Sequence, residues 1–359
     1  MQSARWEATR LMKKSTNRKR TSRIILQSLP AVPVAIVVVI YVMSLMPRST
    51  KKMERGAALI EHKSYYELTV SGKPVAWFDA LTDSCMSDNI MLSADSSVTK
   101  RSIINGCWVN KYAFMPSCHG MILTTDPDSM AYKTMATANK NIGNVIKNTA
   151  ERLESAIKSL SKKDEELRYY LSVHNVNDDG YNTMAYLDGR LKQQKEQAEK
   201  ALEIIRKAQT AKNAAIRLVS KYTLLHKDTA GHTVRIACNT ITPASEKPFR
   251  IIQTSDKQTP DNVSPTYLHQ WFTPATDAER GIIVASYPGC MLNRYDVNGA
   301  KAITFSGKAT GKSRHDIPPM LAPDGAAIYT SDGRMMGISY NGRITGTGNF
   351  GLALKNLLP

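Results

Sequence analysis

The chain has 359 residues, with 48 Lys and Arg against 31 Asp and Glu, a formal net charge of +17. Its composition, 42 % hydrophobic with five cysteines, excludes collagen-like, low-complexity and disulfide-dense small proteins. Residues 1–60 hold 12 Lys or Arg and two Glu, so they supply +10 and leave +7 for the other 299 residues. The basic character is concentrated at the N-terminus, which argues against nucleic-acid binding by the rest of the chain.

Residues 24–47 carry no charge and lie between Arg23 and Arg48. About 20 apolar residues span the hydrocarbon core of a bilayer, so this segment predicts one transmembrane helix. A buried helix of a soluble protein is the alternative, but residues 34–40 offer no polar face to water. Eight Lys or Arg precede the segment and four follow it closely, which places residues 1–23 in the cytoplasm as a basic tail.

The bulk of the chain would then lie outside the cytoplasm, in the periplasm if the source is bacterial. A cleaved signal peptide is the other interpretation of the same segment. The apolar stretch is long for a signal peptide, and no small-residue cleavage site follows it. We therefore expect an uncleaved signal anchor in a single-pass membrane protein.

Residues 131–226 are poor in Gly and Pro and carry apolar residues at spacings of three and four, a helical pattern. The pattern breaks at the turn-forming residues 175–180 and then resumes. This segment predicts an antiparallel helical hairpin, or coiled coil, with two helices of about 40 residues. A solvated spacer is one interpretation. We expect instead a surface for a protein partner or for self-association, because two helices alone leave part of an apolar stripe open.

Short β-rich runs separated by Gly and Pro fill residues 48–130 and 227–359, which predicts a barrel or sandwich. Asp332-Gly333 between two apolar runs is a strong hairpin signal. The fold class is therefore mainly β with an α insertion. The expected strands are Tyr66–Val70, Gly106–Asn110, Thr233–Ala237, Gly281–Ala285, Ala302–Phe305, Ala326–Tyr329, Met335–Ser339 and Phe350–Leu354.

Several of these blocks resemble the trypsin-like serine proteases of the HtrA type. Residues 324–329 and 331–338 are similar to the family's G-N-S-G-G-A-L-V nucleophile region and the G-x-L-I-G-I strand that follows it. Residues 105–109 through 115–119 resemble the G-S-G-F hairpin ending in T-x-x-H, and residues 286–289, 304–309 and 350–359 resemble later blocks in order. The resemblance implies a double β-barrel that the helical hairpin interrupts.

The resemblance also assigns the positions of a catalytic triad. His119 matches the general base, Glu246 falls where the family has its orienting acid, and Asp324 stands at the nucleophile position. An ordinary strand-end histidine and a solvated loop glutamate are the alternatives for the first two. A carboxylate is a poor nucleophile towards amides, so Asp324 argues for a lost reaction.

The turn expected to form the oxyanion hole departs from the family as well. The residues before Asp324 are Ala322 and Pro323 instead of Gly and Asn, and only Gly325 keeps the family residue. Proline has no N–H, and losing one oxyanion donor costs about 10²–10³ in rate. The sequence thus favours vestigial triad positions on a retained fold.

The functional hypothesis is a membrane-anchored, extracytoplasmic pseudoprotease that binds protein and serves as a scaffold, for example in an envelope-associated assembly. The alternative is an active membrane-anchored endopeptidase with atypical catalytic residues. No Cys and His spacing fits a zinc site and no phosphate loop is present, so we expect no metal, no cofactor, no nucleic acid and no small-molecule substrate.

Overall fold

The computed structural model describes Val38, Val42 and residues 48–93, 96–110, 119–241, 249–267, 280–292, 295–310 and 313–346. The helices are α3 (Thr50–Glu54), α4 (Ser129–Lys140), α5 (Ile142–Val173) and α6 (Tyr181–Thr210), with a 3-10 turn at Ser96–Val98. The strands are β1 (Ala57–Val70), β2 (Lys73–Phe78), β3 (Ile90–Met91), β4 (Lys100–Asn110), β5 (Met121–Thr125), β6 (Ala214–Lys227), β7 (Thr233–Thr240), β8 (Phe249–Thr254), β9 (Thr266–Tyr267), β10 (Gly281–Ser286), β11 (Ile303–Thr310), β12 (Arg314–His315), β13 (Ala327–Thr330), β14 (Met335–Tyr340) and β15 (Arg343–Gly346).

The first barrel consists of six antiparallel strands in the order β1-β6-β7-β8-β5-β4. The additional pairing of β4 with β1 closes the ring, and β2, β3 and β9 continue the same sheet outside it. Its interior is filled by apolar side chains from five of these strands, among them Ile60, Trp108, Ile122, Leu224 and Ile252. Because the ring is closed, a strand has an unpaired backbone edge only where it extends beyond the strand next to it.

The second barrel closes in the order β10-β11-β12-β15-β14-β13. Its core includes Ile282, Val284, Ile328, Met336 and Ile344. The predicted turn at Asp332-Gly333 joins β13 to β14, and Gly333 adopts a positive φ of 82° that favours glycine. The hairpin expected from the sequence is therefore confirmed.

The two barrels share one apolar interface, which holds them side by side. Cys107 and Leu123 from the first barrel pack with Ala285, Tyr329 and Ile338 from the second. The described chain is thus mainly β with two closed barrels and a few helices, an arrangement that fits a trypsin-like double barrel.

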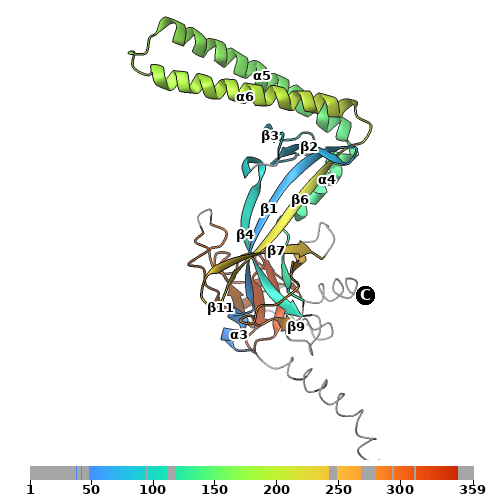
Figure 1. Cartoon of the computed structure of the whole chain (residues 1–359). Coiled ribbons are helices and arrows are strands. Elements are labelled where there is room, and N and C mark those ends of the chain that lie inside the picture. The colour runs from blue at the N-terminus through green and yellow to red at the C-terminus, as the bar shows by residue number, and fades with distance from the viewer. Residues whose placement is uncertain are drawn as a thin grey trace, which may run out of the picture.

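Two long strands carry the chain out of the first barrel towards the helices (Figure 1). β1 and β6 pair along their length, from Leu59 opposite Leu225 to Val70 opposite Ala214. Helices α5 and α6 project beyond them as the predicted antiparallel hairpin (Figure 1). Apolar residues at the base of the hairpin, including Leu153 and Ile205, pack against Leu68 and Phe78 of β1 and β2.

The helical segment is shorter than its sequence pattern indicates. Helix α6 ends at Thr210, and residues 214–227, expected to be helical up to residue 226, form strand β6. The side chains of Ile216, Tyr222 and Leu224 are buried at even spacings, which is the two-residue period of a strand. The Ala, Leu and Lys residues among 214–227 made this two-residue period hard to recognise in the sequence.

The predicted transmembrane segment, residues 24–47, lies outside the described residues apart from Val38 and Val42. Among the helices of the described part of the chain, none combines the length and the apolar character needed to cross a bilayer. The expected strand at 350–354 also lies outside the described residues.

Candidate functional site

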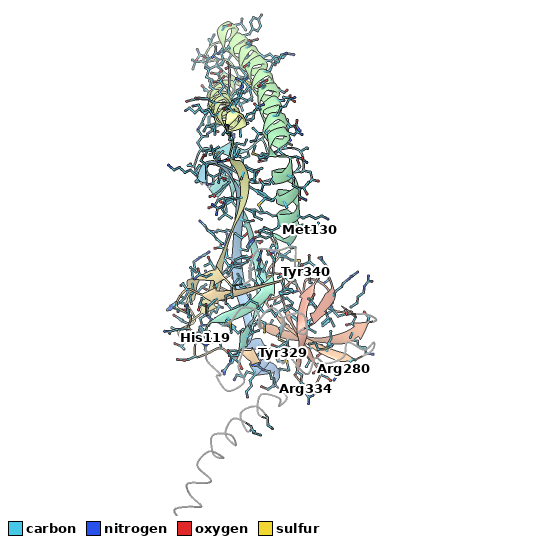
Figure 2. The ribbon with its side chains drawn as sticks, turned by 90° about the vertical axis from the view of Figure 1, so that its right-hand side faces the viewer. His119, Met130, Arg280, Tyr329, Arg334 and Tyr340 are labelled. Carbon is cyan, nitrogen blue, oxygen red and sulfur yellow. The ribbon has the colours of Figure 1, made fainter. Side chains whose placement is uncertain are left out.

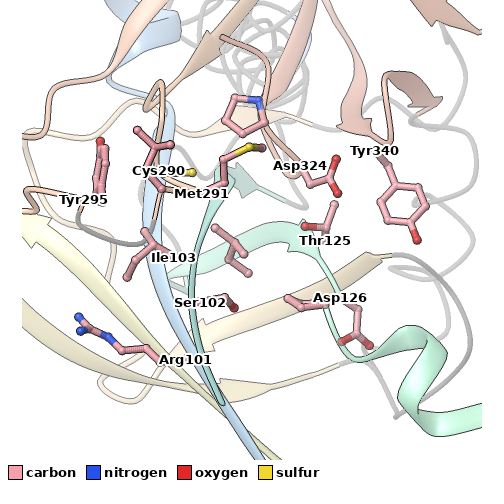
Figure 3. Close-up of a pocket in the computed structure, with 14 residues that line it drawn as sticks. Arg101, Ser102, Ile103, Thr125, Asp126, Cys290, Met291, Tyr295, Asp324 and Tyr340 are labelled. Atoms are coloured by element: carbon pink, nitrogen blue, oxygen red, sulfur yellow. The ribbon is translucent and has the colours of Figure 1, made fainter. Parts of the chain in front are cut away.

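A pocket of about 410 Å³ lies between the two barrels (Figure 3). One wall is β4, the end of β5 forms the floor, and the loop after β10 and the turn before β13 form the opposite wall. The residues that line it are Arg101, Ser102, Ile103, Ile104, Thr125, Asp126, Pro127, Cys290, Met291, Leu292, Tyr295, Pro323, Asp324 and Tyr340.

Asp324 lies in this pocket, at the turn that leads into β13 (Figure 3). Its backbone carbonyl accepts a hydrogen bond from the Asn105 N–H of β4 at 3.3 Å. Its Oδ1 accepts one from the Asn341 N–H at 2.8 Å. Burial raises the pKa of the Asp324 carboxyl above its usual range, and the Asn341 N–H offsets only part of that effect. Asp324 is therefore a half-buried acidic group on the wall of the pocket.

The backbone donors around Asp324 are engaged within the protein. The Ala322 N–H donates to the Pro318 carbonyl at 2.9 Å, and the Gly325 N–H donates to the Ser339 carbonyl at 2.9 Å. Pro323 has no N–H. The predicted oxyanion positions at 322, 323 and 325 thus offer no donor to a bound carbonyl in this conformation.

His119 lies at the opposite end of β5 from the pocket. Its backbone carbonyl accepts a hydrogen bond from Gln253 Nε2 at 2.6 Å, and its side chain is exposed. His119 precedes β5 in a turn, and the strand itself runs about 13 Å from Met121 to Thr125 at the pocket, at about 3.3 Å per residue. Figure 2 likewise shows His119 well apart from Tyr340 of the pocket.

The structure therefore does not bring His119 and Asp324 together, and the expected catalytic pairing of these two residues is wrong. The third predicted position, Glu246, lies outside the described residues. Among the described residues assigned from the resemblance, Pro323 and Asp324 line the pocket, whereas His119, Ala322 and Gly325 do not.

Beside Asp324, the pocket is lined by Thr125, Asp126 and Pro127 from the end of β5 and the residues after it.

A buried polar network, which the sequence did not indicate, fills the end of the first barrel beside the pocket. Nε2 of His62 lies 2.9 Å from Oδ2 of Asp128. The Ser220 hydroxyl donates to the same Oδ2, and the Ser64 hydroxyl donates to Oδ1. Nδ1 of His62 lies 3.3 Å from the hydroxyl of Ser102, one of the residues that line the pocket. The alternation of His62 and Ser64 on β1 is the only signal in the sequence that could have pointed to it.

A second buried pair supports the same end of the barrel. Nε of Arg250 lies 2.6 Å from Oδ2 of Asp126, and both side chains are almost completely buried. Asp126 Oδ1 accepts a hydrogen bond from the Tyr222 hydroxyl at 3.3 Å. The guanidinium of Arg250 also lies over the ring of Tyr132 from α4, with Cζ 5.0 Å from the centroid. This pair fixes the corner between β5 and α4, where Asp126 and Asp128 lie.

Comparison with known proteins does not assign the chain to a family. No family model and no curated protein matches the chain. Among solved structures, the chain is similar to the crystal structure of Deg5, with 8 % sequence identity, 80 % of each chain covered and a TM-score of 0.30.

Proposed function

We propose that the protein binds an extended segment of another polypeptide in the pocket between the barrels and does not cleave it. The observation that carries this proposal is the outer edge of β4. β1 pairs with the inner edge of β4, whereas β5 covers the outer edge only from Gly106 onward. Within the described residues, no strand pairs with the outer edge between Lys100 and Asn105, where β4 lines the pocket.

The backbone groups on this outer edge point into the pocket. The Trp108 N–H donates inward to the Gly56 carbonyl, and the Asn105 N–H donates outward to Asp324. Backbone groups alternate in direction along a strand, so those of Arg101 and Ile103 share the outward direction of Asn105. An extended peptide added along this edge would pair with them by strand addition.

The side chains around the edge favour a particular kind of segment. Met291 and Leu292 are 51 % and 54 % exposed at the pocket wall, which favours apolar side chains in the ligand. Asp324 contributes an acidic group, whereas Arg101 is paired with Glu61. We therefore propose a segment with alternating apolar residues and a Lys or Arg opposite Asp324.

The absence of cleavage is part of the proposal. A carboxylate occupies the nucleophile position, His119 lies before β5 at the end away from the pocket, and the N–H groups of Ala322 and Gly325 already donate to carbonyls of the chain. These features support a pseudoprotease over the alternative of an active endopeptidase at Asp324.

The proposal also retains the predicted membrane anchor at residues 24–47 and the scaffold role of the hairpin, with the barrels outside the cytoplasm. The far end of the hairpin exposes large apolar side chains, with Tyr169 and Tyr186 exposed by 71 % and 65 % and Val173, Val176 and Leu187 exposed beside them. Such a group on a projecting arm supports docking of a protein partner there. Extraction of the full chain from membranes by detergent but not by carbonate tests the anchor.

Binding in the pocket is tested on the full-length chain in detergent with fluorescent peptides that alternate Val and Lys. A second peptide of the same sequence carries N-methyl groups on alternate residues, so it keeps the side chains but lacks the donors of one edge. We expect fluorescence anisotropy to show binding of the first peptide and at least tenfold weaker binding of the second. Mass spectrometry should recover the bound peptide intact.

Two variants locate the site. Leu292→Asp, on the pocket wall, should weaken binding, whereas Tyr186→Ser, at the tip of the hairpin, should leave the affinity unchanged. Equal affinity for both peptides, or cleavage that persists in purified protein, would overturn the proposal.

A further inference from the structure

The hydroxyl of Ser102, the imidazole of His62 and the carboxylate of Asp128 lie next to one another beside the pocket. Ser102 on β4 and His62 on β1 are cross-strand partners, so their side chains lie on the same face of the sheet. Ser102 Oγ lies 3.3 Å from His62 Nδ1, and His62 Nε2 lies 2.9 Å from Asp128 Oδ2. His62 is almost completely buried, whereas Ser102 is half-buried and lines the pocket.

The surroundings of Asp128 favour one placement of the His62 proton. Burial raises the pKa of the Asp128 carboxyl, but His62 and the hydroxyls of Ser220 and Ser64 outweigh it, so that the pKa lies below its usual value. With the proton on Nε2, facing the carboxylate at 2.9 Å, Nδ1 of the imidazole is left as an acceptor. The hydroxyl of Ser102 is then the donor to Nδ1, which is the order of roles in a serine nucleophile, its base and the acid that orients the base.

We infer that Ser102 is a nucleophilic site for acyl transfer, with His62 as its general base and Asp128 as the positioning residue, acting on a small carboxylic ester bound in the pocket. The backbone N–H of Ile103, next to Ser102, faces the pocket by the alternation described above and supplies a donor for the carbonyl oxygen. A volume of about 410 Å³ accommodates a small acyl group.

The reaction needs no redox partner. Ser102 Oγ bonds to the carbonyl carbon of the ester while its proton passes to His62 Nδ1. The C–O bond to the alcohol then breaks, and the departing alcohol takes the proton from His62, which leaves an acyl-Ser102 ester. Water releases the carboxylic acid by the same two proton transfers, with His62 as base towards the water and then as acid towards Ser102.

This inference goes beyond the proposed peptide binding, and it uses the same strand, β4, with the Ile103 N–H that an added peptide would engage. It assigns no nucleophilic role to Asp324, and it uses a histidine remote from His119. A chain that binds peptides but does not react at Ser102, or that reacts but does not bind peptides, would separate the two claims.

The test is covalent labelling of the full-length chain with diisopropyl fluorophosphate, which loses fluoride when a serine oxygen attacks phosphorus. Digestion and mass spectrometry should place the label on Ser102, with no label in Ser102→Ala and an unchanged rate in Ser331→Ala, a control on the exposed β13–β14 turn. His62→Gln should slow labelling at least tenfold, because glutamine removes the base.

A second readout covers the case in which His62→Gln does not fold. In Ser102→Cys, which changes one half-buried atom, iodoacetamide should alkylate residue 102 faster than the buried Cys290. A folded wild-type chain with no label on Ser102, or a folded His62→Gln chain labelled at the wild-type rate, would overturn the inference. The network of His62, Ser102 and Asp128 would then have a structural role at the end of the barrel.

Discussion

The backbone N–H of Asn105 donates a hydrogen bond to the carbonyl of Asp324, which joins β4 of the first barrel to the turn before β13 of the second. Asn105 is fully buried, and its side-chain Nδ2 also reaches the Cys290 sulfur at 2.9 Å. This contact holds Asp324 at the pocket, and His119 lies at the far end of β5. The position of the turn that carries Asp324 thus keeps this carboxyl at the pocket and apart from His119.

Restoring a serine at position 324 should not restore proteolysis. The Asp324→Ser chain lacks a base within reach, and the donors of the turn remain engaged with Pro318 and Ser339. We expect no label from a fluorophosphonate probe on residue 324 by peptide mapping, and no gain in casein hydrolysis over the wild-type chain. Label on residue 324 would show that the turn can open and that a base reaches it.

The same turn depends on a glycine. Gly325 has a φ of 87°, and a Cβ at this position would collide with the backbone carbonyl oxygen of Asn105. Gly325→Ala should lower the free energy of unfolding by more than the roughly 1–2 kcal/mol that left-handed geometry alone costs. Gly342→Ala is the matched control, since Gly342 has a φ of 68° with nothing within 4 Å of its Cβ. Equal losses in urea unfolding would argue against the close approach of the two barrels at Asn105.

Arg250 and Asp126 test the energetics of the buried ion pair. Removing one partner leaves the other charge buried, so Arg250→Met should lower the free energy of unfolding by about 3–5 kcal/mol. The double variant with Asp126→Leu should recover much of that loss. The exposed Glu203–Lys207 pair on α6 serves as the comparison, and Glu203→Gln should change the value by less than about 1 kcal/mol. A double variant as unstable as the sum of the single variants would contradict coupling.

Cys85 should be the most reactive of the described cysteines, all four of which are free thiols. Burial raises the pKa of Cys85, but the Thr82 hydroxyl and the Arg152 guanidinium outweigh it, so its pKa lies below the ordinary value. Burial raises the pKa of Cys238 to about 11 and that of Cys290 to about 12. As pH rises from 6 to 9, iodoacetamide should therefore alkylate Cys85 first, since the thiolate is the nucleophile.

Arg152→Leu should remove this advantage. The guanidinium Nη1 lies 2.9 Å from the Cys85 sulfur, so its loss should move the alkylation profile of Cys85 towards higher pH. Mass spectrometry of each cysteine-containing peptide measures the shift. An unchanged profile would mean that Arg152 does not stabilise the thiolate.

Much of the second barrel could be predicted from sequence because its strands are short, apolar and separated by turn residues. Ala327–Thr330 and Met335–Tyr340 follow that pattern, with Asp332-Gly333 between them. The helical hairpin was equally visible from the spacing of its apolar residues. Both features depend on local periodicity, which a single sequence displays.

The long strands of the first barrel could not be found in this way. The middle of β1 contains Glu61, His62 and Ser64, which are polar residues that a sequence pattern assigns to the surface. They are buried beside partners distant in the chain, such as Asp128 for Ser64 and Arg235 for Glu61. Only the folded structure brings those partners together.

The candidate site was predicted in part, and for a related reason. The resemblance singled out Asp324, which lines the pocket, and His119, which lies in the turn before β5 and does not line it. The Ser102 and His62 pair depends on strand register, which no local pattern shows.

The central claim, peptide addition to the outer edge of β4, is tested most directly by amide-resolved hydrogen exchange of the full-length chain with and without the alternating Val and Lys peptide. The account predicts that the peptide slows exchange at the outward-facing Ile103 N–H. The Ser102 and Ile104 amides, which face β1, should keep their rates, and the peptide should be recovered uncut. Unchanged exchange at Ile103 in the presence of saturating peptide, or cleavage of that peptide by the purified chain, would contradict it.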